Sequence, residues 1–186
     1  NLLEIMIKYT YISEAEVKGM FQVGEHVMYK NIGICEVEAI GKIGFSLDKE
    51  KEYYTLRPLC ATNNSRFYVP VGASASMRNI ISRQEAYQYL AELESMQTKP
   101  FCAAKQTQLT AHYDELLTKY DVTDHLILFK ELCQKEKKIK EDGKKFGQRE
   151  SVYKNQVEKL LIDEFAYALD ETPGASKERL YKATCL

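Results

Sequence analysis

Histidine and cysteine are the residue types that most often form zinc sites, and cysteine is also a common nucleophile. Three histidines and five cysteines are scattered along the 186 residues. They are His26, His112, His125, Cys35, Cys60, Cys102, Cys133 and Cys185. Zinc sites usually draw pairs of ligands that lie a few residues apart, and no such pair occurs here. The sequence therefore predicts no metal site, and we expect His112 and His125 to be surface residues or to flank helices.

Nucleophilic catalysis would need a cysteine such as Cys35 with a depressed thiol pKa. No Gly-x-Ser-x-Gly elbow, phosphate-binding loop or dinucleotide fingerprint is found. The glycines of Gly41-Lys42-Ile43-Gly44 precede a strand pattern, which indicates a hairpin and not a phosphate loop. We therefore expect no enzyme activity, no cofactor and no small-molecule substrate.

A run of basic residues from 135 to 149 could bind phosphate groups. Its cations are Lys135, Lys137, Lys138, Lys140, Lys144, Lys145 and Arg149, and its acids are Glu136, Glu141 and Asp142. The excess of positive charge would suit a nucleic-acid backbone. Acids and lysines at helical spacing, such as Glu131 with Lys135, equally suit a solvated helix end. Both interpretations stay open.

Composition and charge exclude several classes of protein. The formal net charge is −1, so the molecule as a whole is not a polycation that seeks nucleic acid or membranes. An odd number of widely spread cysteines indicates reduced thiols. No apolar run approaches the ~20 residues of a membrane span, and no secretory leader is evident. We expect a cytoplasmic protein without membrane association.

Apolar residues alternate from Met20 to about Val71, which predicts short strands separated by tight turns. Gly24 and Gly33 mark the first turns. Pro70 cannot donate a ladder hydrogen bond, so the strand that contains it should end there or lie at an edge. The prediction is a small SH3- or Tudor-like β-barrel. The preceding residues, 1–19, are either a native extra strand or a vector-derived or upstream extension.

The hydrophobic period changes to that of helices after Gly72-Ala73-Ser74-Ala75-Ser76, and we divide the chain into residues 20–78 and residues 79–186. Ser82 and Glu85 have the spacing of a capping box. We also predict helix caps at Thr123 or Asp124, at Ser151 and at Ser176. The second part is thus an all-helical bundle, and the fold class is α+β.

The opening Phe21-Gln22-Val23-Gly24-Glu25-His26-Val27-Met28-Tyr29 resembles the CarD/CdnL family of bacterial transcription regulators. The resemblance continues through Tyr53-Tyr54-Thr55-Leu56, Val69-Pro70-Val71 and Arg78-Asn79-Ile80-Ile81-Ser82. The first domain of this family also occurs in the transcription-repair coupling factor. A helical half follows in the family, as it does here.

The resemblance implies that the first domain binds the RNA polymerase β subunit by setting a strand edge against a strand of the partner. Candidate edges are the hairpin around residues 38–45 and the strand at residues 53–56. The implied polymerase-binding residues are Lys42, Ile43, Tyr53, Tyr54, Arg66 and Tyr68. Tyrosines at such positions also commonly serve in packing.

The resemblance further implies that the helical half touches promoter DNA non-specifically and changes the stability of the open complex. Family members use a tryptophan as a minor-groove wedge, and this sequence has none. Phenylalanine can act in the same way. The implied DNA-binding residues are Phe101, Lys105, Lys144, Lys145, Arg149 and Lys154. The alternative is a polymerase-docked adaptor whose helices bind another protein and not DNA.

Overall fold

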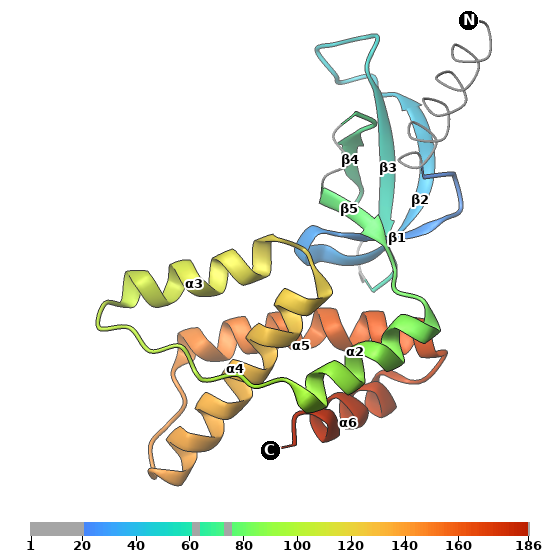
Figure 1. Ribbon diagram of the computed structural model, residues 1–186. Coiled ribbons are helices and arrows are strands. Elements are labelled where there is room, and N and C mark those ends of the chain that lie inside the picture. Colours follow the sequence, from blue (N-terminus) through green and yellow to red (C-terminus); the bar gives the residue numbers. More distant parts are fainter. Residues whose placement is uncertain (1–20, 61–63, 73–75, 186) are drawn as a thin grey trace, which may run out of the picture. The chain divides into compact units, whose positions relative to one another are not determined.

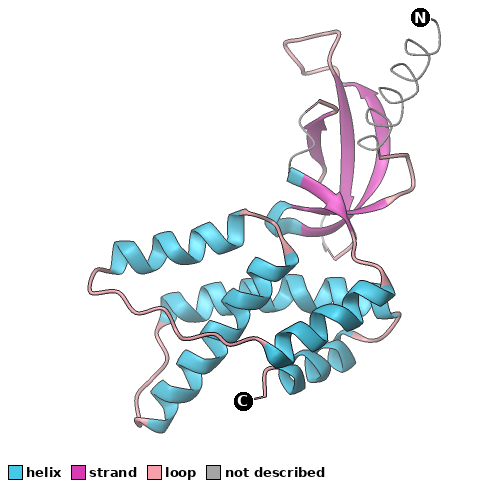
Figure 2. Ribbon diagram, viewed as in Figure 1, coloured by secondary structure: helices cyan, strands magenta, loops and turns pink. Residues whose placement is uncertain are grey.

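The computed structural model describes residues 21–60, 64–72 and 76–185 (Figure 1). The predicted extension at 1–19 and parts of the predicted turns near Asn63 and Ser74 lie outside the described residues. Five strands are followed by five α-helices in this part of the chain (Figure 2), so the predicted α+β class is confirmed. No helix in the described ranges is long and apolar enough to cross a membrane.

The chain divides into two compact units. Among the described residues, one unit comprises the chain up to Val27 together with Cys35–Arg78, and we call it the β unit. The other comprises Met28–Ile34 and the chain from Asn79 onward, and we call it the helical unit. Met28–Ile34, which comprises the end of the first strand, a 3-10 turn and the start of the second strand, is thus part of the helical unit, although it lies early in the sequence.

The strands form one antiparallel-paired sheet in the order β4-β3-β2-β1-β5. Their bounds are β1 His26–Tyr29, β2 Gly33–Lys42, β3 Glu52–Pro58, β4 Phe67–Pro70 and β5 Met77–Asn79. The predicted closed barrel is wrong, because β4 and β5 are the two ends of this order and the sheet is open over the described residues. Closure needs long edge strands that pair with each other, and these two have only four and three residues.

Pairing between β2 and β3 contains one irregularity that matters for the surface. Val37 lies opposite Leu56 and Ala39 lies opposite Thr55, so Glu38 is an extra residue in a β-bulge. Val37, Leu56 and Tyr54 are completely buried on one face of the sheet. The period of two then sends the alternate residues of β3 to the opposite, more exposed face.

Glycines at two sharp turns have the positive φ angles that favour this residue. Gly24 has φ +89 and its N–H donates to the carbonyl of Val37 at 2.8 Å. Gly33 has φ +99 and follows the 3-10 turn η1, Lys30–Ile32. A side chain at either position would be strained, so the turns predicted at these glycines are confirmed with their physical reason.

The helical unit contains five α-helices. Their bounds are α2 Arg83–Ser95, α3 Gln106–Thr118, α4 Val122–Glu141, α5 Gln148–Leu169 and α6 Pro173–Ala183. The predicted capping box is confirmed: the N–H of Glu85 donates to Ser82 Oγ at 3.2 Å, and the N–H of Ser82 donates to Glu85 Oε2 at 2.7 Å. These two bonds fix where α2 begins.

The other three predicted caps are wrong. Asp121 caps α4 by accepting from the N–H groups of Thr123 and Asp124. Ser151 lies inside α5, which begins at Gln148, and its hydroxyl donates back to the carbonyl of Gly147 at 2.9 Å. Thr172 caps α6, and the N–H of Ala175 donates to its Oγ1.

Ser176, which we predicted as a helix cap, makes a different contact. It is 1% exposed within α6, and its hydroxyl donates to the carbonyl of Ile162 at 3.1 Å. For α4 and α6, the actual caps Asp121 and Thr172 lie only a few residues before the predicted ones, whereas α5 begins after Gly147 without a side-chain cap.

Two charged side chains lie buried in the helical core and bind backbone groups there. Lys130 is 4% exposed, and its Nζ donates to the carbonyl of Leu93 at 2.5 Å. It thereby caps the last turn of α2 from the middle of α4. Glu164 of α5 is completely buried and accepts from the N–H of Ile81 at 3.2 Å, next to the start of α2. Both ends of α2 are therefore held by buried charges.

We expect Lys130→Met to lower the free energy of unfolding by about 1–3 kcal/mol, because it removes the donor for a buried helix-end carbonyl while keeping the apolar stem. Chemical denaturation followed by circular dichroism measures the change. Lys137→Met on the exposed part of the same helix is the control, with an expected change within about 0.5 kcal/mol. Equal effects of the two variants would contradict the capping role.

Candidate functional site

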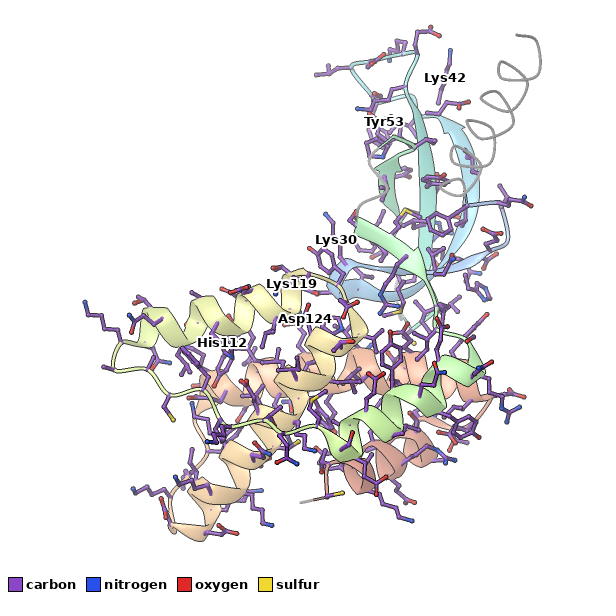
Figure 3. All side chains as sticks on the ribbon, in the orientation of Figure 1. Lys30, Lys42, Tyr53, His112, Lys119 and Asp124 are labelled. Carbon is purple, nitrogen blue, oxygen red and sulfur yellow. The ribbon has the colours of Figure 1, made fainter. Side chains whose placement is uncertain are left out.

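The β2–β3 hairpin carries several of the side chains that the sequence singled out (Figure 3). Lys42 ends β2 and is 53% exposed, and its Nζ forms an ion pair with Glu50 at 2.6 Å. Ile43 follows and is half-buried. Both residues lie where a partner could reach them, although the Lys42 charge is already paired across the hairpin.

The neighbouring tyrosines, Tyr53 and Tyr54, lie on opposite faces of β3. Tyr54 is completely buried, with its ring edge-on to Phe21 at a centroid distance of 6.1 Å. Its ring is core packing and cannot meet a partner in the folded protein. Tyr53 is half-buried on the other face, and its hydroxyl lies 3.1 Å from Ser46 Oγ. Only Tyr53 is therefore available at the surface.

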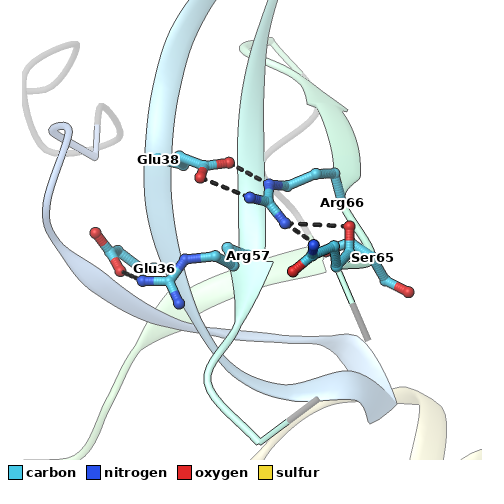
Figure 4. A network of polar contacts seen from close by, with 6 residues as sticks. Glu36, Glu38, Arg57, Ser65 and Arg66 are labelled. Atoms are coloured by element: carbon cyan, nitrogen blue, oxygen red, sulfur yellow. Dashed lines mark hydrogen bonds and ion pairs between the residues drawn. The ribbon is translucent and has the colours of Figure 1, made fainter. Parts of the chain in front are cut away.

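Two ion pairs bridge the exposed face of the sheet (Figure 4). Arg57 pairs with Glu36 directly across the β3–β2 ladder. Arg66 binds the bulge residue Glu38 through two nitrogens, one of them, Nη2, at 2.8 Å from Oε1. The hydrogen bond to Glu38 raises the pKa of the Arg66 guanidinium. A partner carboxylate would have to displace Glu38 to use this arginine.

Exposed apolar side chains gather at the tip of the same hairpin. Phe45 is 69% exposed and lies edge-on to Tyr68 at 4.9 Å between ring centroids, and Tyr68 itself is 41% exposed. Leu47 is fully exposed. Sequence reasoning selected Tyr68 and missed Phe45 and Leu47. The available signal was two large apolar residues inside an otherwise polar tip, which no core requires.

The strand order decides which edge could accept another strand. Residues 53–56 belong to β3, which has β2 on one side and β4 on the other, so this predicted candidate edge is wrong. β2 is different, because it has ten residues and its neighbour β1 has four. The last contact on the β1 side joins Val37 to Gly24 and Glu25. Residues 38–42 therefore extend past β1 in the described part of the chain.

Hydrogen-bond alternation shows which groups point out from this edge. The N–H of Val71 donates to the carbonyl of Glu52, so the backbone groups of Glu52 face β4. Since the direction alternates along a strand, the backbone groups of Tyr54 also face β4, and those of Tyr53 and Thr55 face β2. Their partners on β2 are Gly41 and Ala39. The N–H and C=O groups of Ile40 and Lys42, which alternate with these, consequently point away from the sheet.

The edge of β4 offers fewer outward hydrogen-bond donors to an added strand. By the same alternation, the outward groups there belong to Tyr68 and Pro70. Proline has no N–H, so this edge presents one outward donor over the length of the strand. The unpaired half of β2 is therefore the better template for strand addition among the described residues.

In the helical unit, the predicted DNA-binding side chains differ in how exposed they are and in which residues they contact. Phe101 is half-buried and stacks on His112, with ring centroids 4.1 Å apart. Lys154 is 12% exposed, and its Nζ binds Glu136 at 2.8 Å and the Tyr181 hydroxyl at 2.7 Å. Burial lowers the pKa of Lys154, but the hydrogen bonds with Glu136 and Tyr181 outweigh it and raise the pKa. Lys154 is thus committed to the bundle.

The remaining members are exposed, and their contacts differ. Lys105 is exposed at the start of α3, and Arg149 is exposed and donates to Thr110 Oγ1 at 2.9 Å. Lys144 is 74% exposed and lies 4.0 Å from Asp142, and Lys145 is exposed beside it. The turn between α4 and α5 therefore presents positive charge to solvent.

Within the basic run itself, two further lysines besides Lys144 form ion pairs with acids. Lys135 binds Glu150 and the Tyr113 hydroxyl, each at 3.1 Å, and Lys140 binds Glu136 at 2.7 Å. The predicted pairing of Glu131 with Lys135 is not what the structure shows, because Glu131 binds His112 at 2.8 Å. The free positive charge of this run is smaller than the sequence indicates.

The histidines differ from the sequence prediction. His125 is 1% exposed, so its placement at the surface or on a helix flank is wrong, and its Nε2 lies 3.3 Å from the carbonyl of Leu117. His112 lies between Phe101 and Glu131. No group of three or more His, Cys, Asp or Glu side chains that could hold a metal ion occurs among the residues that the structure describes.

Comparison with known proteins assigns the first part of the chain. Residues 21–81 match the family model of the CarD-like/TRCF RID domain, and this confirms the predicted resemblance for that segment. The match ends just before Ser82, the cap of α2, so it covers the strands and stops where the helices begin. No curated protein matches the chain.

The five thiols should fall into two classes of reactivity. Burial raises the pKa of Cys35 and of Cys133 to about 12, whereas Cys60, Cys102 and Cys185 are exposed. At pH 8 we expect a chromogenic disulfide to label three thiols quickly and the other two only on unfolding. Rapid labelling of Cys35 in the folded protein would instead favour a nucleophilic role for that residue.

Proposed function

We propose that this protein is a transcription regulator that binds the β subunit of bacterial RNA polymerase through its β unit. The observation that carries the proposal is the match of residues 21–81 to the CarD-like/TRCF RID domain. In that family the domain docks on the polymerase by strand addition. The unpaired half of β2 supplies an edge that suits this mode.

Strand addition would use the backbone of β2 for affinity and its side chains for register. Ile40 and Lys42 present two donors and two acceptors away from the sheet, spaced as alternate residues of a strand. The outward-facing stretch of β2 ends at the bulge at Glu38, because the bulge disrupts the regular hydrogen-bond ladder at that position. The added strand would therefore be short and would pair with the hairpin half of β2.

Side-chain contacts at this surface would be more apolar than charged. Arg57, Arg66 and Lys42 each have an acidic partner within the protein. Phe45 and Tyr68 are exposed instead. Interactions between exposed charges are screened by salt, and apolar contacts are not, so polymerase binding should depend weakly on ionic strength.

At the promoter, the proposed effect is a change in the stability of the open complex, without catalysis and without a cofactor. The helical unit would touch DNA non-specifically through exposed cations of the α4–α5 turn, such as Lys144 and Lys145. This proposal places the protein at the polymerase in the bacterial cytoplasm.

A second candidate is a polymerase-docked adaptor whose helical unit binds another protein. Two observations favour it. Phe101 is held in a stack on His112 and would have to leave that stack to wedge into DNA. Lys154, Lys135 and Lys140 are paired with acids within the unit. DNA affinity separates the two candidates.

Docking should fail when the outward N–H of Ile40 is removed. In Ile40→Pro the lost donor is not one that β3 uses, so we expect the fold to persist while affinity for the purified β-subunit lobe falls at least about tenfold. Binding of full-length protein is measured by calorimetry, and circular dichroism reports the fold. Ile40→Val keeps the donor and is the control. If Tyr68→Pro abolishes binding and Ile40→Pro does not, the docking edge is β4.

DNA binding should depend on the α4–α5 turn. We expect the double variant Lys144→Ala/Lys145→Ala to weaken binding to a non-specific duplex and to reduce the salt slope of log K by about 2, since each phosphate contact contributes about 0.9. Fluorescence anisotropy over a range of salt concentrations measures it. Lys49→Ala/Lys51→Ala removes the same charge from the β unit and serves as the control. Identical curves for both variants would favour the adaptor.

A further inference from the structure

Resting on the proposed function, we propose that Gly41 keeps a notch open on the exposed face of the sheet, and that this notch receives an apolar side chain from the polymerase strand added to β2. Gly41 would then determine which partner strand fits. The notch lies where the edge of β2 that is unpaired among the described residues meets the exposed face formed by alternate residues of β2 and β3.

Neither the backbone angle nor the neighbours in the described part of the chain require a glycine at position 41. Its φ angle is not in the positive range, so an ordinary L-residue could adopt its backbone conformation. A Cβ atom built on Gly41 would meet no heavy atom of the described residues within 4 Å, its two chain neighbours aside. Glycine within a strand normally weakens that strand, and where it occurs it often marks a site of close approach by a ligand or another chain.

The usual internal explanation for a strand glycine is an aromatic ring that covers it from the neighbouring strand. Tyr53 lies directly opposite Gly41 and is the residue that could do so. A ring lying over Gly41 would be within contact of the added Cβ, and the surroundings of that Cβ are empty. The Tyr53 hydroxyl is instead near Ser46 Oγ, at 3.1 Å, in the hairpin loop. Over the residues that the structure describes, the notch is open.

Gly41 also occupies the ladder position where an added strand would come closest. Its own N–H and C=O point to Tyr53, so toward an added antiparallel strand it would form a non-hydrogen-bonded pair. In such pairs the Cα atoms approach to about 4.5 Å and the side chains are nearest to each other. A side chain at position 41 would therefore compete directly with the side chain of the partner.

The surroundings of the notch select an apolar occupant. Ala39 and Thr55 form the next pair along the same face, and Tyr53 forms its wall on β3. Farther along this face the charged side chains are paired with each other, Glu36 with Arg57 and Glu38 with Arg66. Both arginines of this part of the face are thus neutralised by acids. An aliphatic or aromatic side chain that lies across Gly41 and meets the Tyr53 ring fits these walls.

The test measures affinity of the full-length protein for the purified β-subunit lobe by calorimetry. We expect Gly41→Val to raise Kd at least about tenfold. Gly41→Ala should raise Kd by a smaller factor, because alanine fills less of the notch than valine does. Melting temperatures should stay unchanged or rise, since an added Cβ meets no described residue and valine favours strands. Gly44→Ala is the matched control, because Gly44 lies in the same hairpin and a Cβ there also meets nothing within 4 Å.

The outcomes separate the inference from the function on which it rests. If the wild-type protein and every variant bind equally well, the notch is overturned and polymerase docking stands. If Gly44→Ala loses as much affinity as Gly41→Val, the effect belongs to the hairpin as a whole and the notch is again overturned. Absence of wild-type binding would overturn docking and the notch together. Gly41→Ala keeps the test decisive should the valine variant fold poorly.

Discussion

The unequal length of neighbouring strands is the constraint on which the surface of the β unit depends. β2 has ten residues and β1 has four, so β1 leaves the hairpin half of β2 without a second neighbour among the described residues. Antiparallel pairing obliges each residue to bond to one side only, and this alternation sends Ile40 outward and Gly41 inward. The pleat of the strand has the same period of two, and it buries the side chain of Tyr54 and leaves that of Tyr53 at the surface.

Charge pairing then determines what the exposed residues can do. An arginine or a lysine in a sequence indicates an available cation, but Arg66 is bound to Glu38 and Lys154 is bound to Glu136. Pairs on the surface contribute little stability. Their effect on function is larger, because a partner has to compete with the internal acid. The apolar pair of Phe45 and Tyr68 faces no such competition.

Buried charges have the opposite role in the helical unit, where they hold the structure itself. Lys130 and Glu164 are almost without contact with water and bind backbone groups at the two ends of α2. A buried charge is tolerated only when it is hydrogen-bonded in this way. Sequence patterns place both residues on helices, but they do not show that α4 and α5 pack against the ends of α2.

The sequence by itself determined the α+β class, the glycine turns, the capping box of α2 and the CarD-like domain, because all of these depend on residues that are close together in the chain. Tertiary structure alone decided that the sheet is open, that β3 has no free edge and that His125 is buried. It also decided which cations are paired. The physical reason is that local periodicity specifies helices and strands, whereas strand order, edges and ion pairs arise between residues far apart in sequence, such as Arg66 and Glu38.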